Sequence, residues 1–354
     1  MPPPPAPPYT IAMVVAPGFN LAASMGVLDP FRAANYLAGT ALFRWEILAC
    51  EGGGEDGGGG ASVRASNAVE ISARPLAGLL ASRATDWSPD LGIVSTSWAP
   101  EAAYGAPLDA ALRRWERHGA MLAGIDTGAF VLAAAGLLRG RRATVHYEHI
   151  DAFAELYPDT TITEDLYVLD GDRLSCCGGA AATDLALQIL SRLHGPALTN
   201  AAARYLFHER LRAPGTHQIP VTAEPLGPAA PSRLRAAIRA MEERLEDPAG
   251  IPEIAAAAGL SQRQLERLFR AHVGRSPLRY YSDIRLDRAR GLVTQTEMPL
   301  REVALASGFS SPESFARAYR ARFGLPPRSD RIEGRVPFEF RAWPMHAPLG
   351  ARPA

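Results

Sequence analysis

The short segment Asp126–Phe130 carries residue types whose spacing could do chemistry. It reads Asp-Thr-Gly-Ala-Phe, directly after the apolar run Met121–Ile125 and before the helical run Val131–Leu138, and His146 follows it. A strand, a sharp turn of small residues and a helix form the elbow that presents a nucleophile in some hydrolases, with a histidine as the base. An aspartate at this turn has two alternative roles: it caps the following helix, or its carboxylate attracts a cationic ligand.

A second group of side chains could read the edges of bases in DNA. The segment Ala255–Ser261 (Ala-Ala-Ala-Ala-Gly-Leu-Ser) recurs 49 residues later as Ala304–Ser310 (Ala-Leu-Ala-Ser-Gly-Phe-Ser), which indicates a duplicated supersecondary unit. A stretch with helical periodicity follows each copy, and its polar positions face away from its apolar ones. Arginine pairs with guanine, glutamine with adenine, and a carboxylate with cytosine. The outward positions are Gln262, Arg263, Glu266, Arg267, Glu313 and Arg317.

Each copy follows the pattern of a helix-turn-helix unit. A short helix leads to a tight turn at Gly259 or Gly308, and a serine then caps the second helix. The capping residues are Ser261 in the first copy and Ser310 or Ser311 in the second. Four further arginines are predicted to contact phosphate: Arg270, Arg275, Arg320 and Arg322. The alternative interpretation is that these are solvated faces of an ordinary helical bundle.

This stretch resembles the tandem DNA-binding domain of the AraC family over about 95 residues. The resemblance implies two recognition helices that enter successive major-groove segments on one face of double-stranded DNA. By motif position it assigns base contacts to Arg263, Glu266, Arg267, Glu313 and Arg317.

Length and composition indicate two folded domains. A chain of 354 residues, of which 47% are hydrophobic and 21% charged, can bury more than one core. A stretch crowded with proline, glycine and small residues separates the alternating first part from the helical second part. We predict a disordered start at 1–8, an α/β ligand-sensing domain at 9–211, a linker at 212–232, an all-α DNA-binding domain with two helix-turn-helix motifs at 233–328, and a flexible tail at 329–354.

Within the first domain, short β-rich apolar runs alternate with helical stretches, which predicts a largely parallel sheet flanked by helices. Residues 52–60 form a glycine-rich, acidic loop that we expect to be mobile. The predicted strands are Ile11–Ala16, Phe43–Cys50, Leu91–Val94 and Met121–Ile125. The predicted helices, besides that of the elbow, are Met25–Leu37, Pro107–His118 and Ala197–Leu211.

Charge and cysteine content exclude several classes of protein. The formal net charge is zero, but residues 233–330 hold 17 arginines and 12 acidic residues, so the basic charge gathers in the second domain. The three cysteines, Cys50, Cys176 and Cys177, are too few for a disulfide framework and lack the spacing of a zinc site, so we expect no metal and a cytoplasmic location. No secretory signal and no apolar run of about 18 residues is present, so we expect no membrane contact.

Together with Arg141–His146 and Cys177–Asp184, the elbow resembles the PfpI-like branch of the class I glutamine amidotransferase superfamily, over about residues 9–195. The resemblance implies a flavodoxin-like sandwich. Its enzymes carry a cysteine at the elbow, assisted by a histidine and sometimes an acid. Here the elbow residue is Asp126, the acid position falls on Ala23, and only His146 matches. We therefore predict no catalytic residue and interpret Cys176 and Cys177 as packing residues.

The fusion of the two domains resembles the GlxA-like regulators. Gly124–Phe130 and Ala143–His149 look like members that control catabolism of glycine betaine, carnitine or arginine. The resemblance implies an activator with a small nitrogenous effector, no cofactor, a homodimer and RNA polymerase as a possible partner. The alternatives are an amidohydrolase or deglycase-like enzyme with a helical accessory domain, and a purely structural role for His146. The predicted ligand-binding residues are Asp126, Thr127, Gly128, Ala129, His146 and Trp98, with cation–π attraction from Trp98 and Tyr147.

Overall fold

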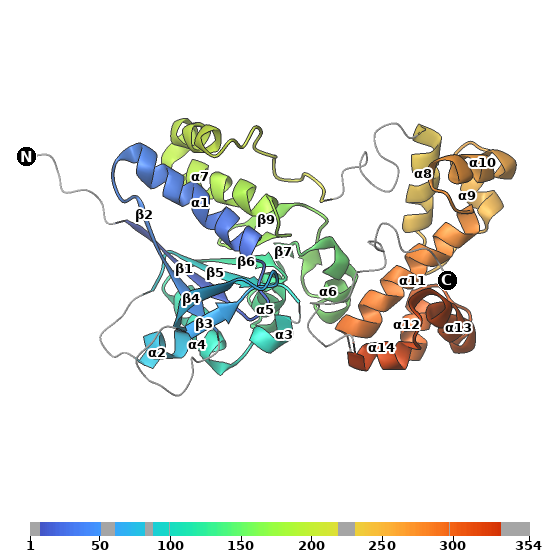
Figure 1. The fold of residues 1–354 in the computed structure, drawn as a ribbon, viewed down its shortest axis with the longest axis horizontal. Coiled ribbons are helices and arrows are strands. Elements are labelled where there is room, and N and C mark those ends of the chain that lie inside the picture. The colour runs from blue at the N-terminus through green and yellow to red at the C-terminus, as the bar shows by residue number, and fades with distance from the viewer. Residues whose placement is uncertain are drawn as a thin grey trace, which may run out of the picture. The chain divides into compact units, whose positions relative to one another are not determined.

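The computed structural model describes residues 8–50, 61–81, 88–98, 100–218, 231–296 and 298–333. The chain divides after Gln218 into two compact units (Figure 1). The predicted disordered start up to residue 7, the predicted mobile loop at 52–60, residues 219–230 of the predicted linker and residues 334–354 of the predicted tail lie outside the described residues. In the described ranges, none of the helices combines the length and the hydropathy needed to cross a bilayer.

The first unit is built on an eight-stranded sheet, counted over the described residues. Only the two edge pairs, at β3 and at β9, are antiparallel, and all the other pairs are parallel. The central order β2-β1-β5-β6-β10 is that of a flavodoxin-like fold, as expected. In spatial order the strands are β3 (Ala61–Arg64), β4 (Glu70–Pro75), β2 (Phe43–Ala49), β1 (Tyr9–Val15), β5 (Leu91–Thr96), β6 (Met121–Asp126), β10 (Arg173–Cys176) and β9 (Tyr167–Asp170). A separate parallel pair joins β7 (Arg142–Ala143) and β8 (Thr161–Ile162).

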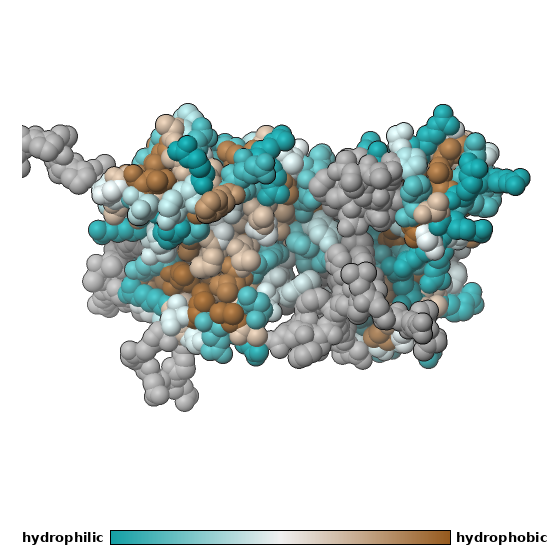
Figure 2. All heavy atoms as spheres, turned by 45° about the horizontal axis from the view of Figure 1, so that its top comes forward, coloured by the Kyte–Doolittle hydropathy of each residue, from teal (hydrophilic) through white to brown (hydrophobic). Residues whose placement is uncertain are grey.

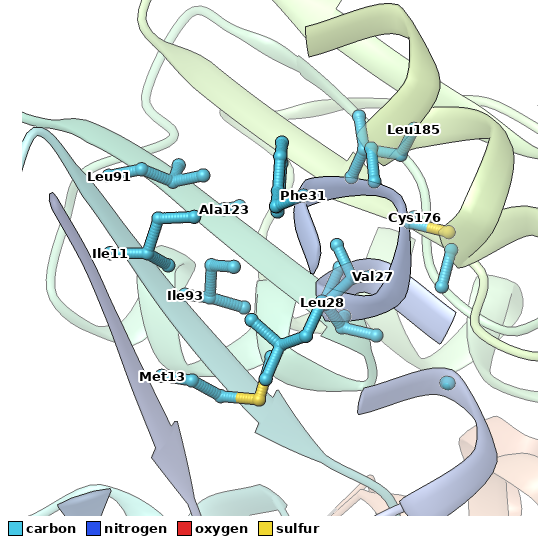
Figure 3. Close-up of a cluster of buried hydrophobic side chains, with 14 of the residues drawn as sticks. Ile11, Met13, Val27, Leu28, Phe31, Leu91, Ile93, Ala123, Cys176 and Leu185 are labelled. Carbon is cyan, nitrogen blue, oxygen red and sulfur yellow. The ribbon is translucent and has the colours of Figure 1, made fainter. Parts of the chain in front are cut away.

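Helices cover both faces of this sheet, so its strands are apolar on both sides. One layer consists of α1 (Leu21–Ala38) and α7 (Ala181–Tyr205), which lie side by side in Figure 1. Figure 3 shows Val27, Phe31 and Leu185 of these helices beside Ile11 and Ile93 of the strands. The other face carries α2 (Leu76–Ala81), α3 (Pro100–Ala103), α4 (Ala106–Arg117), α5 (Gly128–Ala134) and α6 (Ile150–Leu156), which share one buried cluster. The 3₁₀ helix η1 (Tyr147–His149) directly precedes α6.

The helix of the elbow is shorter than predicted. We expected it at Val131–Leu138, but α5 begins at Gly128 and ends at Ala134. Gly136 adopts a left-handed φ of 76°, and the amide of Leu137 donates to the carbonyl of Leu132 at 2.9 Å. The left-handed glycine directly after the C-cap residue Ala135 terminates the helix.

The predicted helix Ala197–Leu211 is also too long. It is the second part of α7, which kinks at Gly195 (φ 81°) and ends at Tyr205. The chain after it is fixed by Asp184, a fully buried carboxylate that accepts hydrogen bonds from Arg212 Nε at 2.8 Å and contacts His208 Nε2 at 2.9 Å. These contacts outweigh helix propensity because they neutralise a buried charge.

Residues 212–218, the start of the predicted linker, pack on the first unit. The amide of Gln218 donates to the carbonyl of Glu164 and the amide of Leu166 donates to the carbonyl of Thr216, both at 2.8 Å. Within the described residues, the segment between the units therefore begins after Gln218.

The second unit is all-α and holds two apolar clusters, one for each repeat. The long helix α11 contributes Tyr281 to the first cluster and Leu286 to the second. This confirms the predicted pair of helix-turn-helix motifs. The described helices are α8 (Ser232–Glu242), α9 (Ile251–Ala257), α10 (Gln262–His272), α11 (Pro277–Gln295), α12 (Leu300–Ala306), α13 (Pro312–Phe323) and α14 (Pro327–Glu333).

The helical unit extends beyond Arg328, where we placed its end. Asp330, assigned to the tail, is fully buried and pairs with Arg290 Nε at 2.8 Å. It also accepts a hydrogen bond from the hydroxyl of Tyr319 at 2.7 Å. Residues up to Glu333 therefore belong to the folded unit.

Candidate functional site

Helix α10 presents the predicted base-reading residues of the first repeat to solvent. Ser261 Oγ accepts from the Gln264 amide at 3.3 Å, and Gln264 Oε1 accepts from the Ser261 amide at 2.9 Å, which completes a capping box. Leu265 and Phe269 are fully buried, so the opposite side of the helix faces outward. The exposed residues there are Gln262, Arg263, Glu266 and Arg267, and Gln262 Nε2 donates to Glu266 Oε1 at 3.1 Å.

Helix α13 is the equivalent element of the second repeat. Ser311, rather than Ser310, is its N-cap: its Oγ accepts from the Ser314 amide at 3.2 Å. Phe315 and Tyr319 are buried, which leaves Glu313 and Arg317 exposed. Figure 2 shows one face of the molecule, on which hydrophilic residues predominate over the helices of the second unit.

The turn between α12 and α13 is held tightly. Gly308 has a φ of 70°, and a Cβ there would lie 2.5 Å from the carbonyl oxygen of Leu245. Arg285 Nε donates to the carbonyl of Ser307 at 2.9 Å, and its Nη2 donates to the carbonyl of Gly308. Only glycine fits this position, which confirms its predicted role in the turn.

Of the arginines predicted to contact phosphate, Arg270 and Arg320 are exposed, but Arg322 is not available. The side chain of Arg322 is only 11% exposed and binds Asp287 through Nη2 at 2.6 Å and Asp283 through Nη1 at 2.9 Å. The prediction for Arg322 was wrong, because it joins α13 to α11 inside the unit. Arg275 is half exposed and pairs with Asp283 at 2.8 Å.

In the first unit, the elbow between β6 and α5 is built by close backbone packing. A Cβ on Gly124 would lie 2.4 Å from the Ala129 amide nitrogen, and one on Gly128 would lie 2.1 Å from the carbonyl oxygen of Val94. Thr127 is fully buried; its Oγ1 donates to the carbonyl of Ser97 and lies 2.8 Å from Thr96 Oγ1. Thr127, Gly128 and Ala129, which we predicted as ligand contacts, are therefore engaged in shaping the turn.

Asp126 stands at the apex of this elbow. Its φ of 63° is left-handed, a conformation that costs free energy for a residue other than glycine and is typical of functional sites. It is not the helix cap, because the N-cap of α5 is Thr127. Its Oδ2 instead accepts a hydrogen bond from Asn20 Nδ2 at 2.9 Å. Burial raises the pKa of Asp126 to about 7, although the bond from Asn20 acts in the opposite direction.

Close packing also fixes the side of Asp126 that faces β10. A Cβ on Gly178 would lie 3.1 Å from Asp126 Oδ2, so a larger residue there would press on the carboxylate. The ends of β6 and β10 thus meet at the carboxyl edge of the sheet, where open α/β sheets bind their ligands.

The segment that carries His146 lies against the elbow. The amide of His146 donates to the carbonyl of Asp126 at 3.3 Å, and its Nδ1 lies 3.8 Å from Glu148 Oε2. The hydroxyl of Tyr147 donates to Glu148 Oε1 at 3.4 Å. Burial raises the pKa of Glu148 to about 7, and the negative charge of Asp126 acts in the same direction. Two buried carboxyl groups therefore influence each other at this site.

Aromatic rings pack on the two histidines of this segment. The ring of His149 lies 5.8 Å from that of Trp98 and 6.1 Å from that of Phe130, between centroids. The ring of His146 stacks on that of Tyr147 at 4.5 Å. The structure thus places His146 beside Asp126, with the Tyr147 ring on His146 and the Trp98 ring on His149.

The two cysteines at the end of β10 are buried. Cys176 belongs to the apolar core under α1 and α7 (Figure 3), and burial beside Cys177 raises the pKa of its thiol well above the ordinary value. A thiolate is the reactive form of cysteine, so this environment opposes nucleophilic chemistry. The position of the superfamily acid, Ala23, is also buried, and its amide donates to Asn20 Oδ1 at 3.1 Å.

Sequence reasoning missed three polar residues of this site: Asn20, Glu148 and His149. Asn20 is the N-cap of α1, a signal that was overlooked because the helix was predicted to begin at Met25. Glu148 and His149 lie close after His146 and end the segment Ala143–His149 that carries the resemblance, which was the available signal.

Comparison with known proteins assigns both units to families. Residues 97–192 match the DJ-1/PfpI family, and residues 254–331 match the Helix-turn-helix domain family. The first match contains the elbow and His146, and the second contains α10 and α13.

Three curated relatives match nearly the whole chain. HTH-type transcriptional regulator CdhR of Pseudomonas aeruginosa is 38% identical over 340 residues, which cover 96% of this chain and 96% of that protein. HTH-type transcriptional regulator GbdR of the same species is 35% identical over 324 residues, which cover 92% of this chain and 84% of that protein. HTH-type transcriptional regulator GlxA of Rhizobium meliloti is 34% identical, with 91% and 95% covered. The chain therefore belongs to the GlxA-like branch of the AraC-family DNA-binding transcription regulators, in which a DJ-1/PfpI-type domain precedes the helix-turn-helix domain.

Proposed function

We propose that this regulator is an activator whose first unit binds a small nitrogenous metabolite of the betaine, carnitine or basic amino acid type. The observation that carries the proposal is the buried carboxylate of Asp126 at the apex of the elbow. Where the enzymes of the superfamily hold a nucleophile, this chain holds a buried carboxyl group whose pKa is raised to about 7 and which a bound cation would keep ionised. The cationic group of a metabolite offsets the cost of burying that charge.

The aromatic side chains favour a ligand whose cationic group is a quaternary ammonium or a planar guanidinium. Trp98 and Tyr147 present faces to which a quaternary ammonium or guanidinium group is attracted. Tyr147 lies between His146 and Glu148 in the chain and stacks on the His146 ring, whereas Trp98 follows β5 and contacts the His149 ring. A ligand of this class gains from charge and from aromatic contact together.

We propose further that the first unit is a sensor without hydrolytic activity. Asp126 replaces the nucleophile, Ala23 stands at the acid position, and the Cys176 thiol is buried with a raised pKa. The curated relatives that cover the chain are named as transcriptional regulators. A sensor needs only a difference in ligand affinity between two states of the protein.

In the second unit, we propose that α10 and α13 read bases in neighbouring major-groove segments of double-stranded DNA. The proposed contacts come from Arg263, Glu266, Arg267, Glu313 and Arg317, together with Gln262 and the Ser311 end of α13, all on the outward sides of these helices or at their capped starts. A homodimer that binds repeated half-sites and contacts RNA polymerase fits an activator. Sedimentation of the protein with and without operator DNA measures the oligomeric state.

The effector proposal is tested by thermal denaturation of the full-length protein with glycine betaine, carnitine or arginine. A ligand that binds only the folded state stabilises it by about 2.7 kcal/mol at a hundredfold excess over its Kd. The shift should disappear in Asp126→Asn, which keeps the shape and suits the left-handed φ because asparagine tolerates that region. Asp159→Asn is the matched control, since the Asp159 side chain is 72% exposed. An equal shift in both variants removes Asp126 from the site, and no shift with any of the three compounds contradicts the effector class.

A further inference from the structure

Three side chains beside the elbow form a cluster of metal-binding donor types. His146, Glu148 and His149 each offer one ligand atom, and these atoms all lie within 4.8 Å of one another. The His146 Nδ1 and Glu148 Oε2 atoms are already 3.8 Å apart. Donors on one zinc ion lie at most about 4 Å apart, because each bond is about 2.0–2.2 Å long. The cluster therefore needs only small side-chain rotations to close on an ion.

The backbone favours this arrangement. Tyr147–His149 form the 3₁₀ helix η1, and the amide of His149 donates to the carbonyl of His146 at 2.8 Å. Side chains three residues apart eclipse each other in a 3₁₀ turn, so the two imidazoles project from the same side. One short turn thus supplies all three donors without a contribution from another element.

The neighbouring side chains hold the donors in place. The Tyr147 hydroxyl donates to Glu148 Oε1, which leaves Oε2 on the side of His146. The His149 ring packs between the rings of Trp98 and Phe130. Such outer contacts orient metal ligands and surround the ion with apolar groups. The Glu148 side chain is only 5% exposed, so its carboxylate has little competition from bulk water for a cation.

We propose that His146, Glu148 and His149 bind one divalent transition-metal ion, with Zn²⁺ as the reference. Two imidazole nitrogens and one carboxylate oxygen form a borderline donor set that suits Zn²⁺, Co²⁺ or Ni²⁺, whereas Mg²⁺ and Ca²⁺ require mainly oxygen. The nearby negative charge of Asp126 adds to the attraction. The sequence-based expectation of no metal considered cysteine spacing only, and this site contains no cysteine.

A metal ion here also gives the carboxylate end of an effector a partner. Three protein donors leave an open coordination position, as in catalytic zinc sites. Betaine, carnitine and arginine all carry a carboxylate, which would bind the metal while the cationic end meets Asp126. This part rests on the proposed function, but metal binding itself does not.

The test measures Zn²⁺ binding to the full-length protein, freed of any purification tag, by equilibrium dialysis. Co²⁺ is used in parallel, because its visible absorption reports nitrogen and oxygen donors. The variants are Glu148→Gln, which keeps the side-chain shape, and His146→Asn, which replaces a side chain that is 32% exposed. His217→Ala is the matched control: His217 Nδ1 lies 3.9 Å from Glu164 Oε2, a histidine–glutamate pair on the surface of the same unit. Retention of the thermal transition confirms that each variant folds.

We expect one equivalent of Zn²⁺ in the wild type and in His217→Ala. Affinity should fall at least about tenfold in both site variants, because loss of a ligand exceeds the effect of losing an outer-shell partner. Absence of stoichiometric binding to the wild type overturns the proposal, and so does equal binding in all the variants. If an effector raises the melting temperature of the metal-free protein, the proposed function stands and the metal has no part in effector binding. If the protein binds metal but no effector raises its melting temperature, the metal site stands and the proposed effector class is wrong.

Discussion

Gln218 is hydrogen bonded to Val145, the residue that precedes His146. The Gln218 Nε2 donates to the carbonyl of Val145 at 2.8 Å and to Thr144 Oγ1 at 2.9 Å. Gln218 is the last residue of the first unit before the segment that leads to the DNA-binding unit. Under the proposed function, this hydrogen bond connects the chain beside His146 to the start of that segment. This connection can transmit a signal to the DNA-binding unit only if the effector binds one of two conformations of the protein more tightly than the other.

The change Gln218→Ala should reduce the effector response while leaving effector binding intact. Effector affinity should stay within about threefold of wild type, since Gln218 contacts backbone and Thr144 rather than the ligand. The gain in DNA affinity on adding effector should shrink. Titration of a duplex, selected by the protein from random sequence, with and without effector measures both. His217→Ala, an exposed neighbour, serves as the control, and an undiminished response in Gln218→Ala contradicts the coupling.

Arg322→Ala should destabilise the helical unit strongly. The change leaves the buried carboxylates of Asp283 and Asp287 without their shared guanidinium, and breaking a buried pair costs about 3–5 kcal/mol. Arg320→Ala, two residues earlier on an exposed position, should change the free energy of unfolding by less than about 0.5 kcal/mol. Urea denaturation followed by circular dichroism separates the two variants. Similar midpoints for both would show that the Arg322 network contributes little.

These arginines also show where sequence reasoning ends. Arg317, Arg320 and Arg322 share a helix, and periodicity alone placed all three on the outside. The inward position of Arg322 depends on Asp283 and Asp287, which lie 35 or more residues earlier in the chain on α11. A pattern within one helix contains no information about a charge on another.

The fold itself was more accessible to prediction than its details. Hydrophobic patterns predicted the strands of the central sheet and the duplicated helices. The strands are buried on both faces and are apolar throughout, whereas each helix is buried on one face and repeats its apolar residues with the helical period. The ends of α5 and α7 did not follow, since Gly136 and Asp184 determine them through backbone conformation and a distant ion pair. At the candidate site, Asn20 follows β1 and Asp126 ends β6, so no local sequence pattern predicts the hydrogen bond between them.

Gly128→Ala should disrupt the elbow. A Cβ at this position would lie 2.1 Å from the carbonyl oxygen of Val94, so the helix or β5 must shift. Overpacking of this kind costs about 1–3 kcal/mol or more. Gly78→Ala is the matched control, because a Cβ there meets nothing within 4 Å and Gly78 is helical. That control should be neutral or slightly stabilising. Thermal denaturation compares them, and an unchanged midpoint for Gly128→Ala would refute the close packing.

Arg267→Ala and Arg317→Ala test whether α10 and α13 read bases. Both residues are exposed, one on each recognition helix. If each arginine binds a guanine through two hydrogen bonds, its removal should weaken binding to the selected duplex by about 1–3 kcal/mol and relax the preference at one base pair. Arg270→Ala is the contrasting variant: if Arg270 binds a phosphate, its removal should weaken binding to all sequences alike and lower the salt dependence. Binding measured on the selected duplex and on single-base variants, at two salt concentrations, distinguishes these roles. A uniform decrease in affinity for Arg267→Ala and Arg317→Ala would assign them to phosphate, and unchanged affinity would mean that these helix faces are only solvated surface.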